Sequence, residues 1–161
     1  DIDLIGEPNE IGKSFAENAK IKSMYGFNKT KLNCFSDDSG ICIDALGGKP
    51  GIHSKRFLNK FKNKNECFKF IINKVAETGK NKASFITYIS LTLANNHHVF
   101  FEGKVDGIIS KKILGGRGFG YDPIFIANGY DRTFGQINKN IKNKFSHRSI
   151  AVNKLINFLS I

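Results

Sequence analysis

The 161-residue sequence predicts a single domain of mixed α and β structure around a central sheet. Capping signals or apolar residues at helical spacing mark three segments, and runs rich in β-branched and aromatic residues lie between them. Hydrophobic residues make up 40% of the chain and include 15 Phe, enough to build a substantial core. No internal repeat or low-complexity linker divides the sequence.

The first predicted helix covers residues 15–25 and begins after Ser14. Ser14 and Glu17 have the spacing of a capping box, in which each side chain binds a free backbone N–H of the first turn. Short apolar runs at 31–35 and 41–46 predict two extended segments. The residues from Asp37 to Gly40 are therefore expected at a junction between strands.

The second helix is predicted over residues 65–77, because one helical face collects Phe68, Ile71, Ile72 and Val75. Residues 84–94 and 98–105 are rich in β-forming residues and flank a short polar turn, which predicts a β-hairpin. Another extended segment is expected at 123–127. The last helix follows Ser146, with an apolar face made of Ala151, Leu155, Phe158 and Leu159.

The chain is strongly basic, with 25 Lys and Arg against 14 Asp and Glu and a net charge of +11. Such a charge attracts nucleic acids, anionic membranes or small polyphosphates. The lysines are spread among many asparagines, which favours a solvated surface over a dedicated nucleic-acid face. No run reaches the length of a membrane span, and Cys34, Cys42 and Cys67 read as reduced, buried thiols of a cytosolic protein.

The stretch "CFSDDSG" is a local concentration of acid in this basic chain. The adjacent carboxylates of Asp37 and Asp38 oppose each other's ionisation, and a hard cation such as Mg²⁺ removes that cost. Glu10 lies upstream as a further carboxylate. The same residues could instead cap a turn before Gly40, and their local pattern does not separate the two interpretations.

Two other segments could contact a ligand. The glycine-rich "GGRGFGYDP" combines aromatic rings with Asp122, which suits a nucleobase, although a strand connection with Phe119 in the core fits as well. Lys142, His147 and Arg148 gather near the start of the last helix, where free N–H groups favour anions. Ordinary surface cations beside a helix cap are the alternative there.

Four motifs together, "SFAENAKIK", "SDDSGICIDALGGKPGIHSKRF", "GGRGFGYDPIF" and "KNKFSHR", resemble the inosine triphosphate pyrophosphatase family in order and spacing over essentially the whole chain. The resemblance implies an elongated, twisted mixed sheet flanked by helices, with two lobes and a central substrate cleft. It implies a cytoplasmic homodimer that uses Mg²⁺ to hydrolyse dITP, ITP or XTP to the monophosphate and pyrophosphate. No stable nucleic-acid partner and no membrane association are expected.

The same resemblance assigns roles to individual residues. Asp38 matches the catalytic carboxylate, which positions or deprotonates water and contacts the metal, with Asp37 and Glu10 as further metal ligands. Substrate contacts are assigned to Ser39 and Lys55. The base-pocket segment is assigned to Phe119, as the stacking ring, and to Gly120, Tyr121 and Asp122. Lys142 matches a substrate-binding cation, and His147 and Arg148 match the pair that contacts the purine.

Two departures from the family pattern qualify this expectation. Relatives carry a first strand and a Ser/Thr-Gly-Asn-x-x-Lys phosphate-binding segment about 30 residues before the equivalent of Asp1, and nothing in this sequence matches it. The domain over residues 1–161 is therefore expected to lack this N-terminal piece and to bind triphosphate weakly. Asn9-Glu10 replaces two adjacent Glu. A non-catalytic nucleotide- or nucleic-acid-binding protein, or a pyrophosphatase for modified pyrimidines, are the alternatives.

Overall fold

A computed structural model describes residues 6, 8–94 and 97–160. Its α-helices and strands are, in chain order, α1 (Phe15–Thr30), β1 (Cys34–Ile43), α2 (Ser54–Leu58), α3 (Lys64–Thr78), β2 (Lys82–Thr92), β3 (His98–Ile109), β4 (Phe125–Ala127), α4 (Lys139–Lys142) and α5 (His147–Leu159). Short 3-10 turns lie at η1 (Asp44–Leu46), η2 (Gly51–His53) and η4 (Asp122–Ile124).

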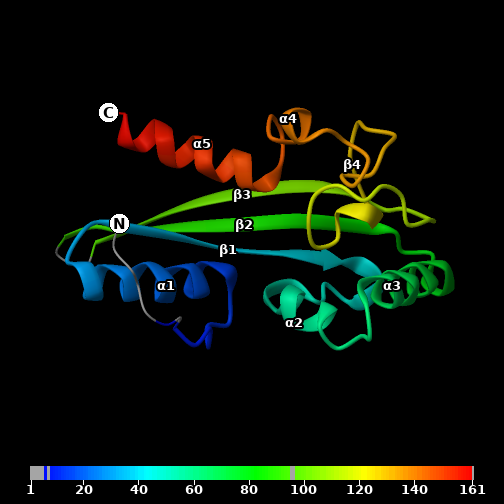
Figure 1. Cartoon of the computed structure of the whole chain (residues 1–161), viewed down its shortest axis with the longest axis horizontal. Helices are drawn as coiled ribbons and strands as arrows, with labels where there is room; N and C mark the ends of the chain where they lie inside the picture. Colours follow the sequence, from blue (N-terminus) through cyan, green and yellow to red (C-terminus); the bar gives the residue numbers. More distant parts are fainter. Residues whose placement is uncertain (1–5, 7, 95–96, 161) are drawn as a thin grey trace.

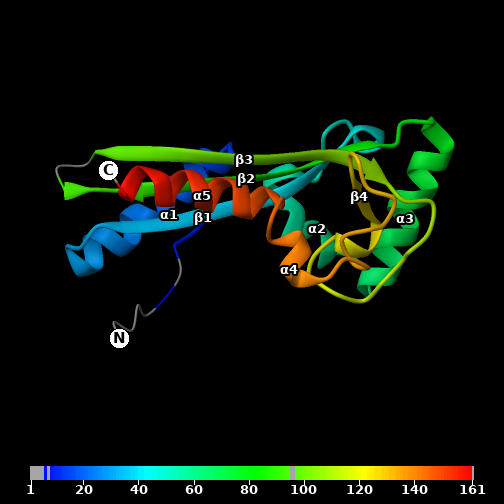
Figure 2. The same cartoon turned by 90° about the horizontal axis from the view of Figure 1, so that it is seen from above.

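The strands form a sheet in the order β1-β2-β3-β4, long in one direction and flanked by helices (Figures 1 and 2). The predicted α/β fold is confirmed. Every described pairing is antiparallel, so the mixed sheet that was predicted is wrong for this part of the chain. Parallel pairing needs two neighbouring strands that run in the same direction, and the described strands alternate in direction across the sheet.

The predicted break at Asp37–Gly40 is also wrong. These residues lie within β1, which pairs with β2 without interruption from Cys34 opposite Thr92 to Ile43 opposite Ala83. The Asp and Gly residues disfavour a strand locally, but pairing along a long neighbour outweighs that preference. Gly40 is required there, because a Cβ at this position would lie 2.3 Å from the carbonyl oxygen of Gly51.

The three predicted helices are present, while the short helices α2 and α4 were not predicted. Ser14 caps α1, which continues beyond the predicted end at residue 25 to Thr30, and Ser146 caps α5. α3, the two long strands and β4 lie where they were expected, while Asn95 and Asn96 of the hairpin turn lie outside the described residues. On α5, Ala151 and Leu155 are buried as predicted, but Phe158 and Leu159 are 40% and 60% exposed.

The two faces of the sheet are packed differently. Ile89, Leu91 and Phe101 pack against α5 in an apolar cluster. On the opposite face, α1 buries Ser23, whose Oγ lies 3.0 Å from Ser90 Oγ and 2.8 Å from Thr92 Oγ1. Figure 1 shows α5 and α1 on opposite sides of the strands.

A second, larger core lies around α3, β4 and the adjoining parts of β1 and β2. It combines isoleucine and aromatic side chains, and Phe85, Phe125 and Phe134 contact one another ring to ring. The three cysteines are free thiols, of which Cys67 is buried and Cys34 and Cys42 are half-buried. Among the described residues, no helix has both the length and the apolar character needed to cross a bilayer.

Candidate active site

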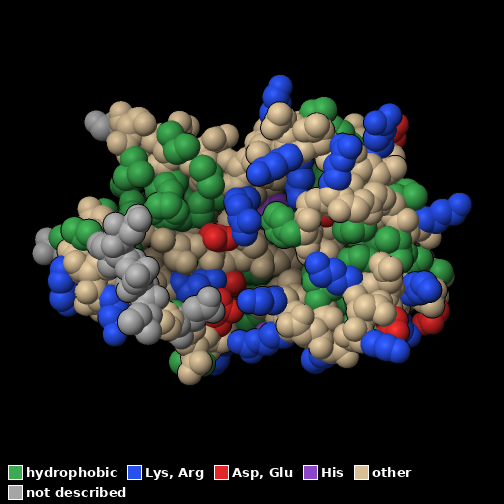
Figure 3. Space-filling model, in the orientation of Figure 1, with side chains coloured by type: hydrophobic (Ala, Val, Ile, Leu, Met, Phe, Trp, Pro, Cys, Tyr) green, Lys and Arg blue, Asp and Glu red, His purple; other side chains and the backbone are tan. Residues whose placement is uncertain are grey.

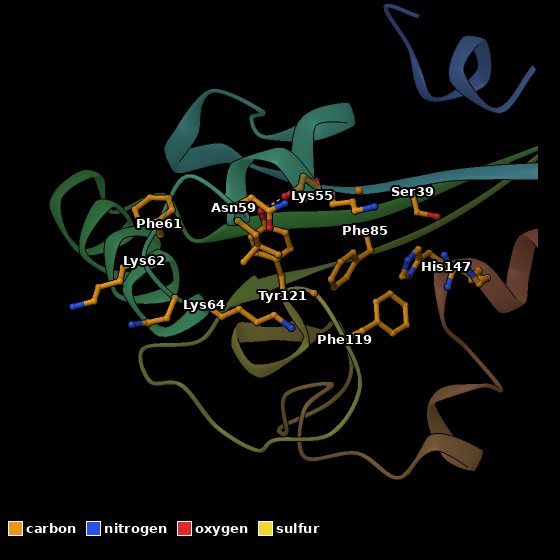
Figure 4. A pocket seen from close by; sticks show the side chains of 16 residues that line it. Ser39, Lys55, Asn59, Phe61, Lys62, Lys64, Phe85, Phe119, Tyr121 and His147 are labelled. Atoms are coloured by element: carbon orange, nitrogen blue, oxygen red, sulfur yellow. Dashed lines mark hydrogen bonds between the residues drawn. The ribbon is translucent and has the colours of Figure 1, made fainter. Parts of the chain in front are cut away.

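Two adjoining cavities lie between the two ends of the molecule. The aromatic cavity, of about 630 Å³, is lined by Phe61, Phe85, Phe119, Tyr121 and His147 among others (Figure 4). The carboxylate cavity, of about 850 Å³, is lined by Glu10, Lys22, Asp37, Asp38 and Arg56 among others. Both cavities share a border made of Ser39, Lys55, Asn59 and Arg148. In Figure 3, acidic side chains lie near the middle of the molecule with Lys and Arg beside them.

Phe119 offers an accessible ring to the aromatic cavity. It is 52% exposed, which excludes the alternative that places it in the core. Lys142 Nζ lies 4.7 Å from the ring centroid and Arg148 Cζ lies 5.2 Å from it, so two cations border the ring. Gly120 follows at φ +59°, a left-handed conformation that glycine adopts without strain.

Asp122 lies behind Phe119 and lines neither cavity. Its Oδ2 accepts from Lys142 Nζ at 2.5 Å and from the Phe119 backbone N–H at 2.7 Å. Burial raises the pKa of Asp122, while the Lys142 ammonium acts in the opposite direction. The role of Asp122 is therefore to hold in place Lys142 and the turn that carries Phe119.

Tyr121 is almost fully buried and is part of the core as well as of the cavity wall. Its hydroxyl donates to the carbonyl oxygen of Ser54 at 2.7 Å, and its ring packs against Phe68. Burial raises the pKa of Tyr121, so the phenol stays protonated. This hydrogen bond joins the base-pocket segment to α2, which carries Lys55.

His147 is 2% exposed and stacks on Phe85, with ring centroids 4.7 Å apart and planes 7° apart. Its Nδ1 is buried without a hydrogen-bond partner. Burial lowers the pKa of His147 to about 3, and the nearby charges of Lys142 and Arg148 add to this effect. His147 is therefore a neutral imidazole in the wall of the aromatic cavity.

Asp38 lies on the face of the sheet that α1 covers. Asn18 Nδ2 donates to its Oδ2 at 3.3 Å, and Lys22 Nζ lies 3.3 Å from its Oδ1. The same ammonium is 2.9 Å from Glu10 Oε1. Burial raises the pKa of Asp38, and Lys22 and Asn18 oppose this shift.

Asp37 points to the opposite face, because neighbouring side chains alternate along a strand. Its Oδ2 accepts from Arg148 at 3.0 Å and from Ser39 Oγ at 2.8 Å. The two adjacent carboxylates thus lie on opposite faces of the sheet and have different neighbours. Asp37 faces α5 and the aromatic cavity's border, whereas Asp38 faces α1 and Glu10.

Glu10 and Asp38 converge on one cation, the Lys22 ammonium. Carboxylate oxygens are the ligands that Mg²⁺ prefers, and this ion commonly takes one or two carboxylates together with water and phosphate. Within residues 6, 8–94 and 97–160, no group of three or more His, Cys, Asp or Glu converges on a point. Glu10 and Asp38 are therefore the pair of carboxylates that could hold such an ion, while Asp37 binds Arg148 and Ser39.

Sequence reasoning missed Asn18, Lys22 and Phe85. Asn18 and Lys22 are four positions apart on α1, the spacing that places side chains on one helical face. That spacing was the available signal, although nothing local showed that the face would meet Asp38. Phe85 carried no signal beyond a β-forming run.

The aromatic cavity and the adjoining carboxylates and lysines, within an elongated α/β fold, form a concave site with convergent polar groups, which is the usual form of an enzyme's small-molecule site. The chain belongs to the Ham1 family, which it matches over residues 1–158. It is 36% identical over 160 residues to the dITP/XTP pyrophosphatase of Christiangramia forsetii, covering 99% of this chain and 84% of that protein. It is 41% identical over 162 residues to that of Dictyoglomus thermophilum, covering 99% and 77%.

A solved structure agrees with these relatives. The Ham1 protein of Staphylococcus aureus superposes with a TM-score of 0.89 at 35% sequence identity, covering 97% of this chain and 81% of that one.

Proposed function

We propose that this chain hydrolyses deaminated purine nucleoside triphosphates, dITP, ITP and XTP, to the monophosphate and pyrophosphate. One observation carries the proposal: the cavity that presents Phe119 and His147 adjoins the cavity that presents Asp38, across a border containing Lys55 and Arg148. A base and its phosphates can therefore occupy the two cavities together. The relatives named dITP/XTP pyrophosphatase support the same activity.

Base selection follows from the side chains around the aromatic cavity. The exposed ring of Phe119 can stack on a purine, and Arg148 and His147 supply hydrogen-bond donors beside it. A 6-oxo group accepts from such donors. The 6-amino group of adenine brings its own hydrogens and leaves a buried donor unpaired, which strongly disfavours binding.

The hydrolytic step belongs to the carboxylate cavity. Asp38 holds a water molecule and accepts its proton as the water oxygen bonds to the α-phosphorus, while the bond from that phosphorus to the bridging oxygen breaks and pyrophosphate leaves. Lys22, Lys55 and Arg56 line this cavity and can neutralise the phosphate oxygens.

Mg²⁺ completes this proposal. Glu10 and Asp38 would hold the ion, which would supply positive charge for the phosphates. We further propose that the enzyme acts in the cytoplasm as a homodimer. Light scattering of the purified protein tests the dimer, and a chelator titration of activity tests the metal.

The test of the proposed function is pyrophosphate release from dITP, XTP, dGTP and dATP in the presence of Mg²⁺. We expect release from dITP and XTP and little from the other two. Equal rates with all four nucleotides, or no release from dITP, would contradict the proposal. Salt-sensitive binding to DNA without nucleotide hydrolysis would instead support a binding protein.

A further inference from the structure

Phe85 and His147 form a stacked pair in the wall of the aromatic cavity (Figure 4). Phe85 comes from the middle of the sheet and is 5% exposed, while His147 is the first residue of α5. Ring planes 7° apart mean that the tilt of one ring determines the tilt of the other.

The backbone of His147 packs directly against Gly103 of β3. Gly103 pairs with Thr87, two residues beyond Phe85 on the same face of β2. A Cβ at Gly103 would lie 1.8 Å from the carbonyl oxygen of His147, so the start of α5 rests directly on β3. Gly103 thus fixes the position of the backbone, and Phe85 the orientation of the ring.

Phe85 cannot itself tilt freely. It lies parallel to Phe134, with planes 4° apart and centroids 5.8 Å apart, and edge-on to Phe125 at 4.7 Å. Phe125 and Phe134 are fully buried. The plane of Phe85 is therefore set by the core, and stacking passes that plane on to His147.

The hydrogen bonding of His147 makes its orientation matter. Nδ1 is buried and unpaired, which leaves Nε2 as the ring nitrogen available to a ligand. A neutral imidazole carries one N–H, and Nδ1 is unpaired in either tautomer, so the place of the hydrogen depends on what Nε2 meets in the cavity. A 6-oxo oxygen in the cavity accepts a hydrogen bond, which favours the tautomer with the hydrogen on Nε2.

We propose that Phe85 is a positioning residue for base selection: it holds the imidazole of His147 so that Nε2–H points at the 6-oxo oxygen of a deaminated purine. This inference rests on the proposed function. The apolar ring of Phe85 forms no hydrogen bond with the base. Its contribution is to keep the single donor of His147 aligned, which favours dITP over dATP.

The kinetic test compares two core variants by the ratio of kcat/KM for dITP to that for dATP. Phe85→Leu keeps an apolar side chain but removes the flat ring, and we expect the ratio to fall about tenfold, the value of one oriented hydrogen bond. KM for dITP should rise by more than kcat falls. The control Phe101→Leu removes a buried ring from the same face of the sheet, but that ring packs against Phe158 of α5 rather than against Phe85 or His147, and the ratio should stay within about twofold of wild type.

An NMR measurement tests the geometry separately from activity. In the wild-type protein, the carbon-bound ring protons of His147 should be shifted upfield by Phe85 and show nuclear Overhauser contacts to it. Both signals should persist in Phe101→Leu and vanish in Phe85→Leu. The wild-type spectrum alone decides the stacking if Phe85→Leu does not fold.

Three outcomes would overturn the proposal: an unchanged nucleotide ratio in Phe85→Leu, an equal loss in both variants, or no ring contact in the wild-type spectrum. Failure of the wild-type protein to hydrolyse dITP would overturn the proposed function instead. In that case the NMR result would still report whether Phe85 orients His147.

Discussion

The two faces of the sheet are packed against their helices by different kinds of side chain. Under α5, the contact is apolar and close, with Ala151 and Leu155 against Ile89 and Leu91. Under α1, the buried helix residues are Asn18, Ala19, Ser23 and Gly26, which are small or polar. The face that carries Asp38 is therefore held together by hydrogen bonds, and the face that carries His147 mainly by apolar contacts.

The comparison explains how one strand serves both halves of a site. β1 presents Asp37 to the α5 face and Asp38 to the α1 face, within one residue of each other. A charged group can be buried on the polar face because Asn18 and Lys22 compensate it. The apolar face instead holds a histidine that remains neutral.

Replacing Asp38 should reveal the largest difference in activity between the two faces. Asp38→Asn removes the proton acceptor while keeping the side-chain size, and we expect dITP turnover to fall at least about 100-fold. Asp37→Asn, the matched change on the other face, should cost about tenfold or less. Circular dichroism should show that both variants remain folded; a fully active Asp38→Asn would disprove its catalytic role.

Lowering the pH should reduce the free energy of unfolding through His147, which lies on the α5 face. Because burial lowers its pKa to about 3 from 6.5, the unfolded chain takes up the proton first as the pH falls. The free energy of unfolding contributed by this group is fully present above pH 6.5 and declines between about 6.5 and 3. His147→Gln should show a shallower decline in this window by urea denaturation, by up to about 1.4 kcal/mol per pH unit; identical slopes would contradict the assignment.

Truncating the apolar face should be costly for stability. Leu155 is 4% exposed within the cluster under α5. Leu155→Ala should reduce the free energy of unfolding by about 3 kcal/mol, through lost burial and a residual cavity. Chemical denaturation measures this, and a cost below that of an exposed position such as Ile156→Ala would show that the face is not tightly packed.

The polar face should be less sensitive to a comparable truncation. Ser23→Ala removes a buried hydroxyl that contacts Ser90 and Thr92, and we expect a loss of about 1 kcal/mol. The exposed Ser160→Ala should be nearly neutral and serves as the control. If Ser23→Ala proved as costly as Leu155→Ala, the contrast between the faces would be lost.

The sequence predicts what local chemistry decides. Ser14 and Ser146 satisfy free N–H groups at helix starts, and both caps are found where the pattern placed them. The continuous β1 could not be predicted from Asp37 to Gly40, because pairing with a distant strand overrides their local preferences.

The site was predictable only where a motif marked it. The structure brings Asp38 and Glu10 together around Lys22, and it groups Phe119 with Lys142, Arg148 and His147. The burial of Asp122 depends on Lys142, which approaches from another part of the chain. The support of His147 by Phe85 likewise depends on tertiary packing, so neither relation leaves a local pattern.

The most direct test of the joined cavities is product analysis after incubating the protein and Mg²⁺ with dITP, and in parallel with dATP. The two-cavity site predicts dIMP and pyrophosphate in equal amounts from dITP and almost no dAMP from dATP. Formation of dIDP and phosphate, or equal conversion of both nucleotides, would contradict it.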